Sequence, residues 1–203
     1  MKVRILFLIC FLSITCLLNA ADKPVIQIHT DNSSLIFRVA DNGRLYQSYL
    51  GKKLNHEADI SHLPQGTEAY ITHGMEDYFE PAIHILHNDG NPSLLLKYVS
   101  HETKAVSQGV NETIITLGDD KYPVTVKLHY VTYPAEDIIK TYTEISHKEK
   151  KPVVLHQYAS SMLHLNRAKY YLTEFSGDWA HEANISDQPL EFGKKVLDTK
   201  LGA

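Results

Sequence analysis

Short segments that alternate apolar and polar residues, separated by turn residues, occur along most of the chain. Residues 124–130 place Val124, Val126, Leu128 and Tyr130 on one face, as a half-buried strand does. The same pattern predicts further strands at 25–30, 35–39, 45–50, 82–87, 94–102, 113–117, 138–146, 153–165, 170–175 and 190–200. Strands spaced in this way predict an all-β fold, an antiparallel sandwich or barrel.

Turn residues divide these strands. Asp41-Asn42-Gly43 predicts a tight β-hairpin turn, and Asn88 to Pro92 and Gly118 to Asp120 predict two more. The polar residues 51–66 predict a long surface loop, and no segment predicts an amphipathic helix longer than two turns. Without an internal repeat or linker, residues 21–203 are expected to form one domain.

The first twenty residues have the pattern of a secretory signal peptide. Lys2 and Arg4 precede an apolar run over 5–18, and Asn19-Ala20-Ala21 offers a small-residue cleavage site. The apolar run is too short for a membrane span, so no membrane anchor is expected. We expect export to the periplasm or the extracellular space.

Cysteine content and charge limit the possible partners. Both cysteines, Cys10 and Cys16, lie in the predicted signal peptide, so the mature chain has no disulfide and needs a hydrophobic core instead. Without Lys2 and Arg4, the 20 basic residues become 18 against 24 acidic ones, a formal charge of −6. This charge argues against nucleic acid as a partner.

The segment 174–182 is the best candidate for ligand binding. It holds the only tryptophan, Trp179, next to Asp178 and close to Glu174 and Glu182. Aromatic faces pack on the C–H side of sugar rings, and carboxylates accept hydroxyl hydrogens. A tryptophan that closes one end of a sandwich core is the structural alternative.

Other kinds of chemistry find weaker support. His84 and His87 have a spacing that points their rings to opposite faces of a strand, and no metal site is predicted. Ser160 and Ser161 lack a positioned base. Paired carboxylates for glycoside hydrolysis could come from Glu76 and Asp77 or from Glu174 and Asp178, but such residues also fill ordinary turns.

Residues 173–203 resemble the end of the N-terminal β-domain of family 36 glycoside hydrolases, the retaining α-galactosidases. That family carries a Ser-Gly-x-Trp-x-x-Glu segment, which residues 176–182 match, and then a Ser-Arg-x-Gly-x-Ser-Ser-His segment, whose opening resembles 199–203. The family's Gly-x-Asp-Tyr/Phe-Arg-x-Pro segment resembles residues 74–81. Here there is one extra residue before Asp77, and Phe79 replaces the arginine.

The resemblance implies a large antiparallel β-sandwich, a galactose-mutarotase-like supersandwich, followed by a (β/α)8 barrel that carries both catalytic aspartates. This chain would then hold no catalytic residue, no metal and no cofactor. It would be a fragment whose partners are the missing C-terminal barrel and α-galactoside sugars. Asp77 and Trp179 are the implied substrate-binding residues, and Asp178 and Glu182 are assigned to the domain interface. The family's N-terminal domain also contributes to a neighbouring subunit's sugar pocket, which makes a homo-oligomer possible.

Two hypotheses of other classes stay open at this point. The chain could be a stand-alone carbohydrate-binding or assembly module, or a purely structural sandwich, because a fold alone implies no function.

Overall fold

The computed structural model describes residues 23–75, 80–165, 169–178, 181–191 and 193–198. The chain divides into two compact units, one up to Ser161 and one from Met162 onward. Among the described residues, no helix is long and apolar enough to cross a membrane.

The first four-stranded sheet is antiparallel and has the order β1-β2-β3-β4. Its strands are β1 (Val25–His29), β2 (Ser33–Val39), β3 (Leu45–Lys52) and β4 (Thr67–Glu68). The predicted turn joins β2 to β3, and Gly43 has φ +77°, a conformation that glycine adopts without steric cost. A short helix, α1 (Glu57–Ser61), lies between β3 and β4. It buries Ile60, whose carbonyl oxygen accepts a hydrogen bond from the Arg38 guanidinium on β2.

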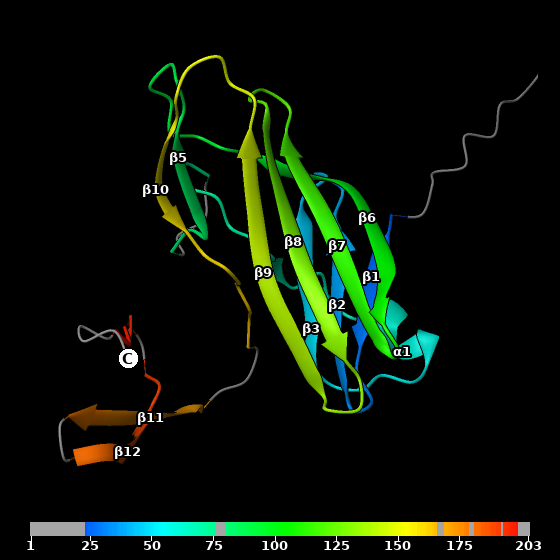
Figure 1. The fold of residues 1–203 in the computed structure, drawn as a ribbon. Helices are drawn as coiled ribbons and strands as arrows, with labels where there is room; N and C mark the ends of the chain where they lie inside the picture. The colour runs from blue at the N-terminus through cyan, green and yellow to red at the C-terminus, as the bar shows by residue number, and fades with distance from the viewer. Residues whose placement is uncertain (1–22, 76–79, 166–168, 179–180, 192, 199–203) are drawn as a thin grey trace, which may run out of the picture. The chain divides into compact units, whose positions relative to one another are not determined.

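The second four-stranded sheet is also antiparallel, with the order β6-β7-β8-β9. Its strands are β6 (Leu96–Ser107), β7 (Val110–Asp119), β8 (Val124–Tyr133) and β9 (Ile138–His147). The predicted face of β8 is confirmed, because Val124, Val126, Leu128 and Tyr130 are all buried. Figure 1 shows these long strands in front of β1, β2 and β3.

The core lies between the two sheets. Phe37 of β2 is fully buried and packs against Tyr130 of β8, with ring centroids 5.2 Å apart. At the sheet ends, the Asp31 N–H donates to the Pro134 carbonyl over 3.2 Å, and the Tyr98 N–H donates to the Gly43 carbonyl over 2.8 Å. The all-β sandwich predicted from the sequence is therefore confirmed.

A small antiparallel sheet completes the first unit. It pairs β5 (Ile83–Leu86) with β10 (Val154–Tyr158). On the other side of β5, the segment 69–73 contacts the strand through a parallel bridge between Thr72 and Ile83. Ile83 and Ile85 are buried, so one face of β5 belongs to the core.

The second unit holds one antiparallel hairpin, β11 (Tyr171–Asp178) and β12 (His181–Pro189). At its base, the Leu190 N–H donates to the Tyr170 carbonyl over 2.8 Å. The prediction of a strand over residues 190–200 is wrong, because the described residues from Leu190 onward have no strand conformation.

Two other sequence-based boundaries also need correction. The expected strand 153–165 ends at Tyr158, because its partner β5 is only four residues long and offers no further backbone to pair with. Ser160 and Ser161 therefore lie outside any strand. The expected loop 51–66 contains the end of β3 and helix α1.

Candidate functional site

The residues that the sequence singled out for sugar binding lie outside the described part of the chain. Asp77 and Trp179 both fall there, as does Glu76. Their proximity to other groups therefore stays a prediction.

The described residues of the Ser-Gly-x-Trp-x-x-Glu segment, 176–178 and 181–182, belong to β11 and β12. Asp178 is the last residue of β11 and pairs through its backbone with His181, and Glu182 is exposed on β12. The Glu174 carboxylate accepts a hydrogen bond from the Gln188 amide across the hairpin, over 3.0 Å. This carboxylate thus serves a cross-strand contact.

One face of the hairpin carries large exposed apolar side chains on either side of a hydrogen-bonded Thr173–Asp187 pair. Phe175 pairs with Ile185, and Tyr171 lies on the same face four residues before Phe175. All three side chains are about two-thirds exposed. A face of this kind is typical of a surface that another part of a protein covers.

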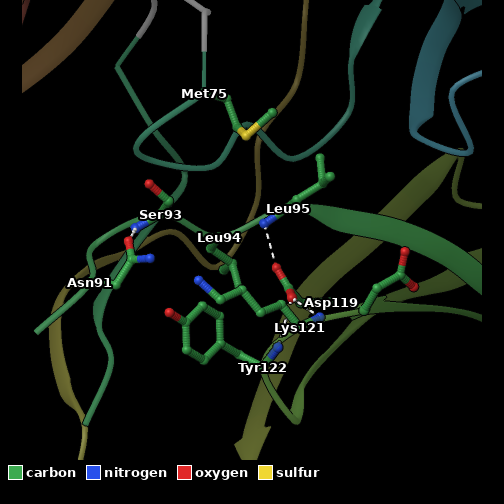
Figure 2. Close-up of a pocket in the computed structure, with 9 residues that line it drawn as sticks. Met75, Asn91, Ser93, Leu94, Leu95, Asp119, Lys121 and Tyr122 are labelled. Carbon is green, nitrogen blue, oxygen red and sulfur yellow. Dashed lines mark hydrogen bonds between the residues drawn. The ribbon is translucent and has the colours of Figure 1, made fainter. Parts of the chain in front are cut away.

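A pocket of about 200 Å³ opens in the first unit next to Met75 (Figure 2). Met75 lies on one side of it, and Lys121 and Tyr122 lie on the opposite side in this view. The residues that line the pocket are Met75, Asn91, Ser93, Leu94, Leu95, Asp119, Asp120, Lys121 and Tyr122. Its volume is below the roughly 300–1,000 Å³ of pockets that enclose a small ligand.

The carboxylates of this pocket are already engaged. Asp119 accepts backbone hydrogen bonds from Leu95 over 2.6 Å, from Lys121 over 2.6 Å and from Tyr122 over 2.8 Å. Asp120 pairs with Lys97. Because Asp119 closes the turn after β7 and Asp120 is ion-paired, the pocket lacks the two free carboxylates that glycoside hydrolysis requires.

The aromatic ring in the pocket wall is also covered. Tyr122 stacks on His87 with ring centroids 3.5 Å apart, and Lys121 Nζ lies over the Tyr122 ring at 4.9 Å from its centroid. The Tyr122 hydroxyl donates a hydrogen bond to the Asp89 carboxylate over 2.9 Å. Tyr122 therefore offers no open face to a sugar ring.

A buried ionisable pair lies behind Tyr122. His87 Nδ1 is 2.7 Å from the Glu149 carboxylate, and His87 Nε2 is 3.1 Å from the Ser93 carbonyl oxygen. Burial raises the pKa of the Glu149 carboxyl, but hydrogen bonds from His87 and Asn88 outweigh it and hold this pKa below its usual value. The pair ties the turn after β5 to the segment after β9.

A second polar cluster crosses the solvent-facing side of the second sheet. The Glu112 carboxylate on β7 accepts hydrogen bonds from Tyr142 over 2.5 Å and His129 over 2.9 Å, and it pairs with Lys104 over 3.0 Å. These three contacts, of which the Tyr142 hydrogen bond is the largest, lower the pKa of Glu112 to about 2. The cluster joins all four strands of the sheet.

The two histidines considered as metal ligands lie in different surroundings. His87 is buried against Glu149. His84, on β5, instead contacts two imidazole rings from other segments of the chain. Within the described residues, no group of three or more histidine, cysteine or acidic side chains is arranged to hold a metal ion.

Sequence reasoning missed the Glu149–His87 pair and the Glu112 cluster. Their members lie 62, 30 and 17 residues apart, so no local pattern marks them. At Glu112 the one available signal was a carboxylate directly before the predicted strand 113–117, within the observed β7.

The comparisons with known proteins agree on one family. The family model described as "Glycosyl hydrolase family 36 N-terminal domain" matches residues 42–203. A probable α-galactosidase G of Aspergillus terreus is 24% identical over 142 residues, which are 64% of this chain and 20% of that protein. α-Galactosidase C of Emericella nidulans is 25% identical over 142 residues, which are 64% of this chain and 19% of that protein.

Solved structures show the same fold. The family 36 α-galactosidase AgaA of Geobacillus stearothermophilus superposes with a TM-score of 0.75 at 19% identity, over 84% of this chain and 28% of that one. The α-galactosidase of Lactobacillus brevis gives 0.72 at 21% identity, over 83% of this chain and 28% of that one. The chain thus spans about a fifth of the curated relatives that it matches. Since the family model covers most of its length, the chain belongs to the N-terminal domain family of the family 36 glycosyl hydrolases.

Proposed function

We propose that this chain is the N-terminal, non-catalytic domain of an exported α-galactosidase. The intact enzyme would hydrolyse terminal α-D-galactosides with retention, through the two-carboxylate double displacement of retaining glycosidases. In it, the sandwich would support a (β/α)8 barrel that holds both catalytic aspartates.

One observation carries this proposal. The match to the family 36 N-terminal domain runs over residues 42–203, and both curated relatives, named as α-galactosidases, are about five times longer than the matched part. A domain of this family in this position precedes the rest of an enzyme. The predicted signal peptide at residues 1–20 supports export.

The chemistry of the described residues supports a non-catalytic role. A retaining mechanism needs one carboxylate free to attack and a second one free to exchange a proton. Asp119 is held by three backbone N–H groups, Glu149 by His87 and Asn88, and Glu112 by Tyr142, His129 and Lys104. These buried or turn carboxylates are committed to holding the fold together.

Sugar binding by this domain is the finer part of the proposal. Two of the solved family 36 structures are complexes of AgaA variants with raffinose and with stachyose. We assign sugar contacts to Asp77 and Trp179, and contacts with the barrel to Asp178 and Glu182. A homo-oligomer would let Asp77 reach the sugar pocket of a neighbouring subunit.

The first experiment tests the enzyme context. The DNA after codon 203 is sequenced, and the purified chain is assayed with p-nitrophenyl α-D-galactoside. We expect an in-frame continuation into a barrel, and no turnover above buffer by the chain itself. A stop codon at this point with a stably folded product would favour a stand-alone carbohydrate-binding or assembly module, and clear turnover would overturn the non-catalytic assignment.

The second experiment tests Trp179. Galactose titrations and melting curves are compared for the wild type and Trp179→Ala. If the ring supports the junction and also contacts sugar, the variant loses stability, as large aromatic truncations do, together with galactose affinity. An unchanged melting temperature with lost galactose affinity would instead identify Trp179 as an open sugar platform.

A further inference from the structure

Three histidines from distant parts of the chain stack on one face of the small sheet. His84 is on β5, His156 is on β10, and His73 follows the segment that bridges to β5. The His73 and His84 ring centroids are 3.7 Å apart with an interplanar angle of 21°, and those of His84 and His156 are 4.8 Å apart. Figure 1 shows β5 and β10 side by side at the edge of the first unit.

The backbone brings the three rings together. The pairing of β5 with β10 shifts between Leu155 and Gln157, so His156 is the extra residue of a β-bulge. On the other edge of β5, the His73 N–H donates to the Ile83 carbonyl over 3.0 Å. The stack thus spans all three segments of the small sheet.

The stack has no counter-charge among the described residues. No hydrogen bond or ion pair there joins His73, His84 or His156 to a carboxylate. The Glu80 carboxylate accepts a hydrogen bond from the amide of Gln157, the residue after His156, over 3.3 Å. Burial, then the neighbouring His73 and His156, lower the pKa of His84.

Neutral and protonated rings behave differently in this geometry. Neutral imidazole rings can stack as other aromatic rings do, and the 4.8 Å between His84 and His156 lies within the usual range of about 4.5–7 Å. Two imidazolium ions at this separation repel each other, and among the described residues no carboxylate is hydrogen-bonded or ion-paired to these rings. The other face of β5 keeps Ile83 and Ile85 in the core.

We propose that His73, His84 and His156 form an acid-sensitive latch that holds β5, β10 and the segment 69–73 together. With neutral rings the latch is closed. When more than one ring is protonated, the three segments separate and the small sheet opens locally, while the two four-stranded sheets stay folded. Since β10 is the last strand of the first unit, opening would loosen the chain that leads to the second unit.

The sign of the effect follows from His84. Its pKa is lower in the folded chain than in the unfolded one, so the unfolded or opened form binds more protons in acid. The stability of the closed latch is therefore fully present above about pH 6.5, the ordinary value for histidine, and is lost as the pH falls through the folded pKa of His84.

The test is a pH titration of the full chain by NMR. The imidazole C–H signal of His84 should titrate below the ordinary histidine value of about 6.5. The His73→Gln, His156→Gln double variant should move the His84 midpoint back up. An ordinary histidine midpoint for His84 in the wild type, unmoved by the double variant, would overturn the proposal.

Hydrogen exchange reports the opening itself. Between pH 7.5 and 5, the protection factors of the Ile83 and Ile85 amides should fall about tenfold for each pKa unit by which His84 is lowered. The protection of Val126 in β8 should stay unchanged over this range. The His147→Gln control should show the same loss of β5 protection as the wild type. Constant protection of β5 over this range would contradict the latch.

Discussion

Phe37 and Phe175 both lie on antiparallel strands, yet one is fully buried and the other is 69% exposed. Phe37 on β2 faces a second sheet and packs against Tyr130. Phe175 on β11 has one paired strand, β12, whose Ile185 lies opposite it and is equally exposed. The two regions differ in the layer that covers the strand.

This difference shows which part of the chain buries its own apolar side chains. A sandwich buries its inner faces within one unit, whereas an isolated two-stranded hairpin is marginally stable in water. The apolar face with Tyr171, Phe175 and Ile185 has the character of a surface made for contact with another body. This agrees with the proposal that the chain is one domain of a longer protein.

The largest expected effect is in the sandwich core. Phe37→Ala should lower the free energy of unfolding by about 3–5 kcal/mol, because it removes a buried aromatic ring and leaves a cavity against Tyr130. Urea unfolding measures it. Ile138→Ala, at an exposed position on β9, is the matched control and should change stability by less than about 0.5 kcal/mol. Equal losses for the two variants would mean that the sandwich is not packed as described.

A smaller effect is expected at the buried pair. Glu149→Gln removes the charge that strengthens the hydrogen bonds from His87 and Asn88, and should cost about 2 kcal/mol. Asp120→Asn, at a mostly exposed carboxylate paired with Lys97, is the control and should cost less than about 0.5 kcal/mol. A neutral result for Glu149→Gln would show that the pair contributes no more than an ordinary surface contact.

Alternation along the sequence predicted which residues point inward but not which strands meet. The inner face of β8 and the turn at Gly43 follow from local rules of pleat and left-handed backbone. Strand β12 was missed because His181 to Pro189 is largely polar and exposed, so it lacks the apolar period on which strand prediction depends.

The polar contacts could not be predicted from the sequence, for a related reason. His87 meets Glu149, and His84 meets His73 and His156, only through the pairing of β5 with β10 and with the segment 69–73. Such non-local pairings leave no spacing rule in the sequence. Asp77 was predicted from a family motif, and Trp179 was predicted from its neighbouring carboxylates and from a family motif; the roles of both stay predictions.

The next effect appears only in acid. Hydrogen bonds, first from Tyr142 and then from His129 and Lys104, hold the pKa of Glu112 at about 2. Its stabilising contribution is therefore fully present above about pH 4.5, its ordinary value, and is lost as the pH falls toward 2. Between pH 5 and 2.5, the free energy of unfolding, measured from unfolding curves, should depend more steeply on pH for the wild type than for Glu112→Gln. Identical pH dependence would rule out a stabilising role for the cluster.

The smallest effect on stability is expected on the hairpin. Phe175→Ser removes an apolar ring that is mostly in water already, so little buried area is lost and the melting temperature of the sandwich should stay within error. The same substitution removes a large part of the apolar face shared with Tyr171 and Ile185, so the fluorescence of an apolar dye bound to the chain should fall. Val106→Ser, at an exposed position on β6, is the control and should leave the dye signal nearly unchanged. A loss of sandwich stability in Phe175→Ser would mean that the ring is buried in solution and that the contrast with Phe37 does not hold. An unchanged dye signal with unchanged stability would mean that this face is not an apolar contact surface, and the hairpin would then owe its order to backbone pairing alone.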